Sequence, residues 1–423
     1  MNQFFARPLG AVILLLAITG SVFAEENSPA GAITLRESLA RAAESNPGLK
    51  ALAYELRISE ARREQAGLRP NPRLGLELQN FPGSGEFADG GRAEITLALS
   101  QIIELGDKRQ LRVGVEQAGY GVAETGIAIR RLDLAAEVVR RFIRALGDQE
   151  LLAAQRLRLE LAEQTLVTVE ARVQAARSPV AELHRARAAR DRALLDQRRM
   201  ETDLLVSLHR LSALWGETQT SIASVRADLY ALPAVSNFDQ LLAATRESAD
   251  VQNLLSEARM RDAELRLAEA QRRPDVTLGA GIRRLEEFDD VAMVFSMELP
   301  LTLYDKNQGN IRAAQARREQ ADAVFEARLN QAQAELFGFH QQLLQARAQT
   351  EFLRGQVLPE LELALQQTQT AYERGRYSYL ELADAQRNLM EVREAIIDSA
   401  TRYHGILAEI ERITGQPMAL PAN

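Results

Sequence analysis

Two carboxylates in the C-terminal part of the chain have a spacing that would allow them to select cations. Glu381 and Asp384 are three residues apart in a segment whose apolar residues recur with helical spacing, so both side chains lie on one face of a helix. Acidic side chains that line a pore favour cations over anions. The same two acids are also compatible with an ordinary solvated helix surface, and the residues alone leave both interpretations open.

The sequence offers no comparable set of residues for enzymatic chemistry. It has no cysteine, which excludes disulfides, cysteine metal sites and a lipid-modified N-terminal cysteine. It also has no phosphate-binding loop and no nucleophile elbow, and its net charge of -7, with bases interleaved among acids, argues against a nucleic-acid partner. The four histidines lack the spacing of zinc ligands: His184, His209, His340 and His404. We therefore expect no enzymatic activity, no cofactor and no resident metal.

Two stretches about 200 residues apart have the alternation of a β-strand pair in an otherwise helical sequence. In the first stretch Leu74, Leu76 and Leu78 alternate with polar residues, and in the second Phe295 and Met297 do the same. This period of two predicts strands with one apolar and one hydrophilic face. The four predicted strands span about residues 72–80, 93–104, 275–283 and 291–303.

Each predicted strand pair is followed by a long helical hairpin. Only 5% of the residues are aromatic, which favours long packed helices over one large globular core. The turns of the two hairpins align at an offset of 200 residues, which places Ser178 opposite Ser378. The predicted helices span about residues 107–176, 180–215, 307–374 and 379–414.

The sequence therefore predicts a mainly α fold with membrane β-strands, built from two tandem repeats. Each repeat combines a two-stranded β pair with a long α-helical hairpin. The predicted parts are a signal peptide at 1–24, a first repeat at 25–216, a linker at 217–237, a second repeat at 238–415 and a C-terminal tail at 416–423.

The N-terminal residues have the pattern of a cleaved secretory signal. Arg7 precedes an apolar run from Leu9 to Ile18, and the small residues Val22 and Ala24 stand before Glu25. The apolar run is shorter than the ~20 residues that a membrane span needs, although a retained N-terminal anchor is the alternative. We expect the chain to be exported.

The strand pairs cannot stand alone, because an isolated two-stranded ribbon is marginal in water. One chain supplies four strands, whereas a transmembrane barrel needs at least about eight, so closure requires several chains. Export, the lipid-like strand faces and the very long helices favour an outer-membrane location. The alternatives are a soluble sheet packed on the helices, a coiled-coil structural protein and a periplasmic adaptor with one hairpin.

Across residues 33–415 the layout resembles the TolC family of outer-membrane efflux proteins. The segments LSQIIELGDKR (Leu99–Arg109) and MELPLTLYDKNQGN (Met297–Asn310) resemble that family's metal-cation (cobalt, zinc, cadmium) branch. The resemblance implies a homotrimer with a twelve-stranded β-barrel in outer-membrane lipid, continued by an α-helical barrel across the periplasm. It also implies a periplasmic adaptor and an inner-membrane RND-type pump as partners, with this chain as a passive exit duct for metal cations or, alternatively, for drugs.

The resemblance also assigns functional positions to this sequence. The positions matched by Glu182, Glu381 and Asp384 form the inner constriction of the family's channels, and the position matched by Tyr372 helps to hold it shut. Closed channels of the family carry an arginine at the position matched by Tyr377, so the closing bonds are expected to differ here. The hairpin turns that meet the adaptor are matched by Arg177, Ser178, Pro179, Gly375, Arg376 and Ser378.

Overall fold

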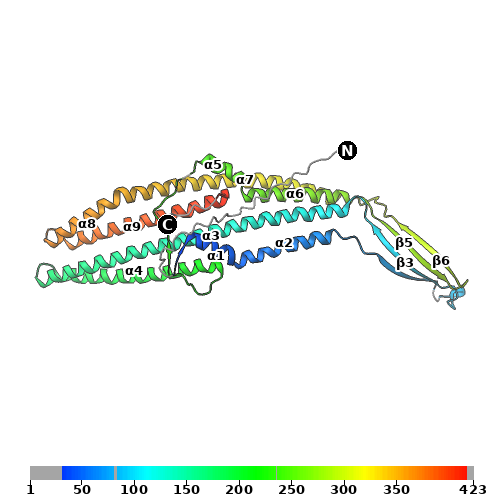
Figure 1. The fold of residues 1–423 in the computed structure, drawn as a ribbon, viewed down its shortest axis with the longest axis horizontal. Helices are drawn as coiled ribbons and strands as arrows, with labels where there is room; N and C mark the ends of the chain where they lie inside the picture. Colours follow the sequence, from blue (N-terminus) through cyan, green and yellow to red (C-terminus); the bar gives the residue numbers. More distant parts are fainter. Residues whose placement is uncertain (1–30, 81–82, 235, 417–423) are drawn as a thin grey trace, which may run out of the picture.

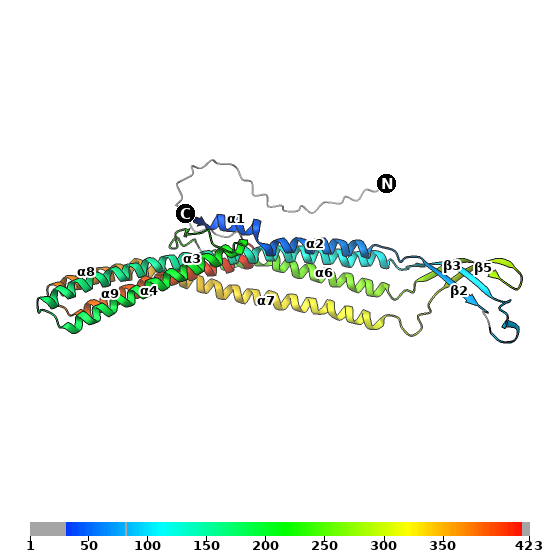
Figure 2. The same ribbon diagram turned by 90° about the horizontal axis from the view of Figure 1, so that it is seen from below.

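The computed structural model describes residues 31–80, 83–234 and 236–416. The predicted signal peptide at 1–24 and the tail after residue 416 lie outside the described residues. The molecule is elongated, with the strands gathered at one end and the tips of two helical hairpins at the other (Figure 1). The two hairpins lie side by side in Figure 1, and in the view of Figure 2 one lies in front of the other.

Long helices make up most of the described chain. Those of the first repeat are α1 (Leu35–Ser45), α2 (Pro47–Ala66), α3 (Lys108–Gln174) and α4 (Val180–Ser212), followed by the 3-10 turn η2 (Ala213–Trp215). Those of the second repeat are α5 (Phe238–Arg246), α6 (Ala249–Ala270), α7 (Gln308–Phe352), α8 (Leu358–Glu373) and α9 (Tyr379–Thr414). The helix α3 packs along α4, α6 and α9, so it connects the two repeats.

The strands of both repeats form one antiparallel sheet in the order β2-β3-β5-β6. Their bounds are β2 (Arg73–Gln79), β3 (Glu94–Ile103), β5 (Val276–Leu285) and β6 (Asp290–Glu298), and the 3-10 turn η1 (Gly85–Phe87) lies between β2 and β3. The central pairing joins the repeats, from Glu94 opposite Leu285 to Ile103 opposite Val276. The edge strands β2 and β6 each have one neighbour, and their apolar side chains are exposed, for example Leu74 at 71% and Phe295 at 74%.

The strand β6 is shorter than the predicted strand at 291–303. It ends at Glu298, which lies opposite Thr277 in β5. Beyond that point β5 offers almost no further partner, because it begins at Val276, and Pro300 has no backbone N–H for a ladder hydrogen bond. The apolar alternation nevertheless continues through exposed Leu301.

The predicted continuous helix at 307–374 is interrupted. A π-helical turn, η3 (Leu353–Val357), separates α7 from α8. Pro359 follows it in the first turn of α8. Because proline lacks the N–H that the helical ladder needs and its ring clashes with the preceding turn, the ladder is rearranged at this point.

A parallel strand pair that the sequence did not predict lies midway along the helices. It joins β1 (Ala32–Thr34) to β4 (Ser224–Arg226), and β4 lies within the predicted linker at 217–237. Strands of three residues are too short to give a periodic signal. The pair lies over a core that includes Phe142, Leu211 and Trp215. Within the described part of the chain, no helix is both long and apolar enough to cross a membrane.

Candidate gate at the helical tips

The two hairpin tips have the same backbone turn. In the first, Ala176 adopts a left-handed conformation (φ 54°) and the N–H of Arg177 donates to the carbonyl of Arg172 at 2.8 Å. In the second, Gly375 is left-handed (φ 74°) and the N–H of Arg376 donates to the carbonyl of Ala371 at 2.9 Å. Both helices therefore end in a turn with a six-to-one hydrogen bond.

The tips correspond one residue away from the predicted offset of 200. The next helices begin at the N-cap residues Pro179 and Ser378, so Pro179, rather than Ser178, is the equivalent of Ser378. By the same correspondence Glu182 and Glu381 are both the third residue of their helices. The predicted alignment missed this shift because the hairpins differ by one residue in length, which periodicity alone does not reveal.

At the second tip the sequence forms a capping box. The carboxylate of Glu381 accepts hydrogen bonds from the N–H of Ser378 at 2.7 Å and from its hydroxyl at 2.9 Å, while the N–H of Glu381 donates to the hydroxyl of Ser378. The backbone N–H of Ser378, together with its hydroxyl, lowers the pKa of Glu381. This glutamate, predicted as a gate residue, is thus bound within its own helix end.

At the first tip the equivalent glutamate contacts the other hairpin. Pro179 has no hydroxyl, so no side chain caps α4. The hydroxyl of Tyr372, at the end of α8, donates to Glu182 Oε2 at 3.4 Å. Tyr372 is only 1% exposed, and burial, then the negative charge of Glu182, raises the pKa of Tyr372. The structure therefore brings together two of the four predicted gate residues, Glu182 and Tyr372.

Asp384, the third predicted acid, lies one turn further along α9. Its carboxylate pairs with Arg387 and accepts a hydrogen bond from Asn388 Nδ2 at 3.3 Å. Both partners belong to the same helix, and the Asp384 side chain is half exposed. Within one chain, Asp384 therefore contacts neither Glu182 nor Tyr372 through any described hydrogen bond.

The structure adds Arg172, which sequence reasoning missed. This residue lies in the last turn of α3, and its Nε donates to Ser178 Oγ at 3.0 Å. One terminal nitrogen donates to the backbone carbonyl of Tyr372, and Cζ lies 4.5 Å from the centre of the Tyr372 ring. A basic residue in the last turn is a usual feature of helices, so the sequence held no signal for a contact across hairpins.

The residues predicted to meet an adaptor lie on the outside of the tips. Of this set, Ser178 is half-buried and the other five are exposed: Arg177, Pro179, Gly375, Arg376 and Ser378. Beside them the structure exposes three apolar or aromatic side chains, Val180 at 57%, Tyr377 at 46% and Leu380 at 68%. Exposed apolar side chains of this kind are typical of a surface that binds a partner protein.

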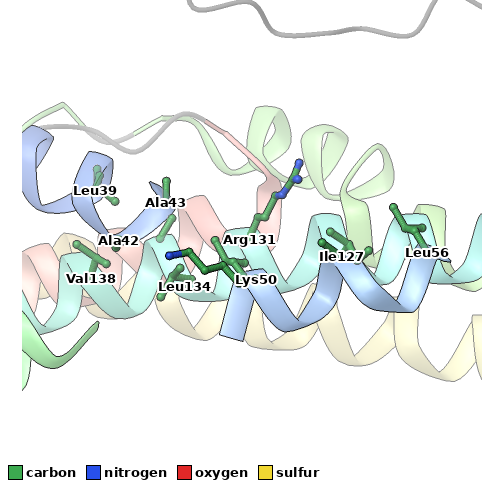
Figure 3. A pocket seen from close by; sticks show the side chains of 12 residues that line it. Leu39, Ala42, Ala43, Lys50, Leu56, Ile127, Arg131, Leu134 and Val138 are labelled. Carbon is green, nitrogen blue, oxygen red and sulfur yellow. The ribbon is translucent and has the colours of Figure 1, made fainter. Parts of the chain in front are cut away.

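A large cavity lies far from the tips, among α1, α2 and α3 (Figure 3). It has a volume of about 630 Å³ and is lined mainly by leucine, isoleucine, valine and alanine. Its charged lining residues are Lys50 and Arg131, so it does not suit a cation. Among the described residues no group of three or more His, Cys, Asp or Glu side chains could hold a metal ion.

The sequence profile of the family described as "Outer membrane efflux protein" matches residues 39–217 and 241–416. This chain belongs to that family. The two matched ranges correspond to its two repeats, so the predicted resemblance, the outer-membrane location and the function in efflux are confirmed. In this efflux protein the tips bring together two of the predicted gate residues, Glu182 and Tyr372.

Two curated relatives of this efflux protein are metal-resistance proteins. The cobalt-zinc-cadmium resistance protein CzcC of Cupriavidus metallidurans is 29% identical over 395 residues, covering 92% of this chain and 91% of CzcC. The nickel-cobalt-cadmium resistance protein NccC of Alcaligenes xylosoxydans xylosoxydans is 28% identical over 320 residues, covering 75% of this chain and 71% of NccC.

Solved structures have the same fold. A crystal structure of CusC has a TM-score of 0.74 at 18% identity, covering 93% of this efflux protein and 96% of the CusC chain. The outer-membrane channel OprN has a TM-score of 0.76 at 18% identity, covering 91% and 90%. The predicted fold class, two repeats of strand pair and helical hairpin, is confirmed.

Proposed function

We propose that this protein is a passive exit duct for divalent metal cations, acting as the outer-membrane part of a tripartite efflux system. The similarity to CzcC over 92% of the chain carries the choice of metal cations. The energy for export comes from an inner-membrane RND-type pump, and a periplasmic adaptor passes the substrate from the pump to the duct.

The duct is a homotrimer. The strand order β2-β3-β5-β6 leaves β2 and β6 as open edges, and open edges cannot persist in lipid because their N–H and C=O groups would lack partners. Four strands are too few for a transmembrane barrel, so several chains must contribute. The resemblance to the TolC family sets the number at three chains, which together supply twelve strands. The exposed apolar face of the sheet then contacts outer-membrane lipid.

The tips form the periplasmic gate. Glu182 and Tyr372 connect the two hairpins, and Asp384 adds a carboxylate that three copies would repeat as a ring, which favours cations. Glu381 contributes to the same ring less directly, because Ser378 binds its carboxylate. The adaptor docks on the exposed turns 177–179 and 375–378.

Deletion of the gene tests the choice of substrate. We expect the deleted strain to accumulate cobalt, zinc or cadmium and to lose tolerance to them, with normal tolerance restored by the wild-type gene. Unchanged metal tolerance together with a new sensitivity to drugs would contradict the metal assignment and would favour a drug duct.

Crosslinking tests the docking surface. Because the chain has no cysteine, Ser178→Cys and Ser378→Cys each introduce a unique thiol, and Ser59→Cys on α2 serves as a control far from the tips. We expect adducts with a co-expressed adaptor from the two tip positions. Absence of an adduct at both tips would contradict docking there.

A further inference from the structure

Arg172 is placed between the two tips, and its side chain contacts residues of both hairpins. Its Nε donates to Ser178 Oγ at 3.0 Å, and one terminal nitrogen lies 3.4 Å from the carbonyl of Arg177. These contacts anchor the guanidinium in the turn of its own hairpin. The other terminal nitrogen donates to the carbonyl of Tyr372, in the second hairpin.

The same guanidinium lies over the ring of Tyr372, with Cζ 4.5 Å from the ring centre. Arginine is suited to this position because its planar group stacks on an aromatic face while its edge donates several hydrogen bonds. The carbonyl of Tyr372 lies at the C-terminal end of α8, where a positive charge is favourable. One side chain of the first hairpin thus contacts both the backbone and the ring of a buried residue of the second.

No carboxylate within the described ranges lies within ion-pair distance of Arg172. Its partners are neutral oxygens and a π-system, so the contact can break without leaving a buried acid unpaired. The corresponding position of the second hairpin, by the one-residue shift found at the tips, is Ala371, which has no such group. The guanidinium contact between the hairpins is therefore made only by the first hairpin's arginine, without an equivalent contact from Ala371.

We propose that Arg172 is the positioning residue that keeps the gate closed, by fixing Tyr372 where its hydroxyl meets Glu182. This inference rests on the proposed function as a gated duct. Opening then requires the first tip to move away from the end of α8, which breaks the guanidinium contacts and the hydroxyl contact together. An adaptor bound at the exposed turn beside Arg172 would be in a position to cause that movement.

Single-channel recording of the purified full-length protein in planar bilayers tests this role. We expect Arg172→Ala to raise the fraction of time spent open by about tenfold or more, since it removes a cation–π contact and several hydrogen bonds. Arg172→Lys keeps the charge but not the planar fork, so it should give an intermediate value. Thermal dissociation of the trimer should be unchanged in both variants, because neither the strands nor the core around Phe142, Leu211 and Trp215 is altered.

Arg187→Ala is a matched control. Arg187 pairs with Glu170 at 3.0 Å within the first hairpin and is half exposed, so its loss should leave the open fraction unchanged. A second test combines Arg172→Ala with Tyr372→Leu, which retains the backbone carbonyl but removes the ring and the hydroxyl. The effect of Arg172→Ala should be smaller in that background than in the wild type.

The outcomes separate the two proposals. An open fraction for Arg172→Ala equal to that of wild type and Arg187→Ala would overturn the role of Arg172 while leaving the duct intact. Equal effects of Arg172→Ala with and without the Tyr372 ring would also overturn it. A wild-type protein that forms no channel would overturn the duct itself, and the gate with it.

Discussion

The two hairpin tips share a backbone turn but differ in the residue that begins the next helix. At the second tip Ser378 caps α9 and binds the carboxylate of Glu381. At the first tip the N-cap of α4 is Pro179, which has no side-chain hydroxyl, and the equivalent Glu182 accepts instead from Tyr372 of the other hairpin. The glutamate at the third position of the helix therefore binds its own helix end at the second tip, whereas at the first tip it contacts the other hairpin.

This difference indicates how a duplicated element acquires a new contact. A serine N-cap stabilises its own helix and forms hydrogen bonds with the carboxylate of the glutamate three residues later. A proline N-cap gives up that local stabilisation, and the free carboxylate becomes available to a neighbour. In this protein the neighbour is the end of α8, which Arg172 contacts as well. The first tip is therefore expected to control closure, and the second to be more rigid by itself.

Replacement of Tyr372 should have the largest effect on this arrangement. Tyr372→Ala removes a buried ring that belongs to the core of the tips, and losses of this kind cost about 3–5 kcal/mol. We expect a mostly open channel and faster amide exchange at both tips. Tyr377→Ala, at a ring that is 46% exposed, is the control and should leave both measurements near wild type; equal effects of the two variants would contradict the account.

Pro179→Ser should make the first tip resemble the second. A serine N-cap contributes roughly 1 kcal/mol to helix stability, and it would draw Glu182 into a capping box. We therefore expect slower amide exchange in the first turn of α4 together with a channel that opens several times more often. Pro179→Ala removes the ring without adding a hydroxyl, so it should not open the channel. An increase in opening with alanine as large as with serine would count against capture of Glu182.

Ser378→Ala tests the opposite change at the second tip. Loss of the serine cap should destabilise the start of α9 by about 1 kcal/mol, seen as faster amide exchange over its first turn. Channel closure should change little, because Glu182 and Tyr372 are untouched. Ser378→Thr keeps a capping hydroxyl and should restore slow exchange, whereas a fully open Ser378→Ala channel would show that the tips are not functionally distinct.

The smallest effects are expected at the left-handed residue of each turn. Ala176 adopts φ 54° and Gly375 adopts φ 74°, a conformation that disfavours a side chain by about 1 kcal/mol. Ala176→Gly should therefore stabilise the first tip slightly and Gly375→Ala should destabilise the second. A β-carbon at Gly375 would lie 3.8 Å from the Arg172 guanidinium, which is ordinary contact, so strain alone is expected. Local exchange rates that move in the same direction in both variants would contradict this.

Much of the fold could be predicted because it depends on simple periodicities. The alternation around Leu76 and Phe295 predicted the strands, and the low aromatic content of 5% predicted long packed helices. The end of β6 at Glu298 and the π turn before Pro359 were not predicted. The strand ends where β5 offers almost no further partner, and the π turn forms because Pro359 lacks a backbone N–H. The three-residue strands β1 and β4 are too short for any periodic signal.

The candidate site was predictable as a set of positions but not as a set of bonds. Family resemblance assigned Glu182 and Tyr372 to the gate, and the structure brings them together. The local role of Glu381 follows from Ser378 three residues earlier, a capping signal that could have been recognised in the sequence. The contact of Arg172 with Tyr372 depends on how two distant hairpins pack, for which one sequence gives no pattern.

The most direct test of the central claim is single-channel recording of the wild-type protein in a planar bilayer with a salt gradient. We expect channels that are mostly closed and that favour cations, as read from the sign of the reversal potential, and that open when the contacts of the first tip are removed. A protein that forms no channels, or one that forms freely open channels without preference for cations, would contradict that claim.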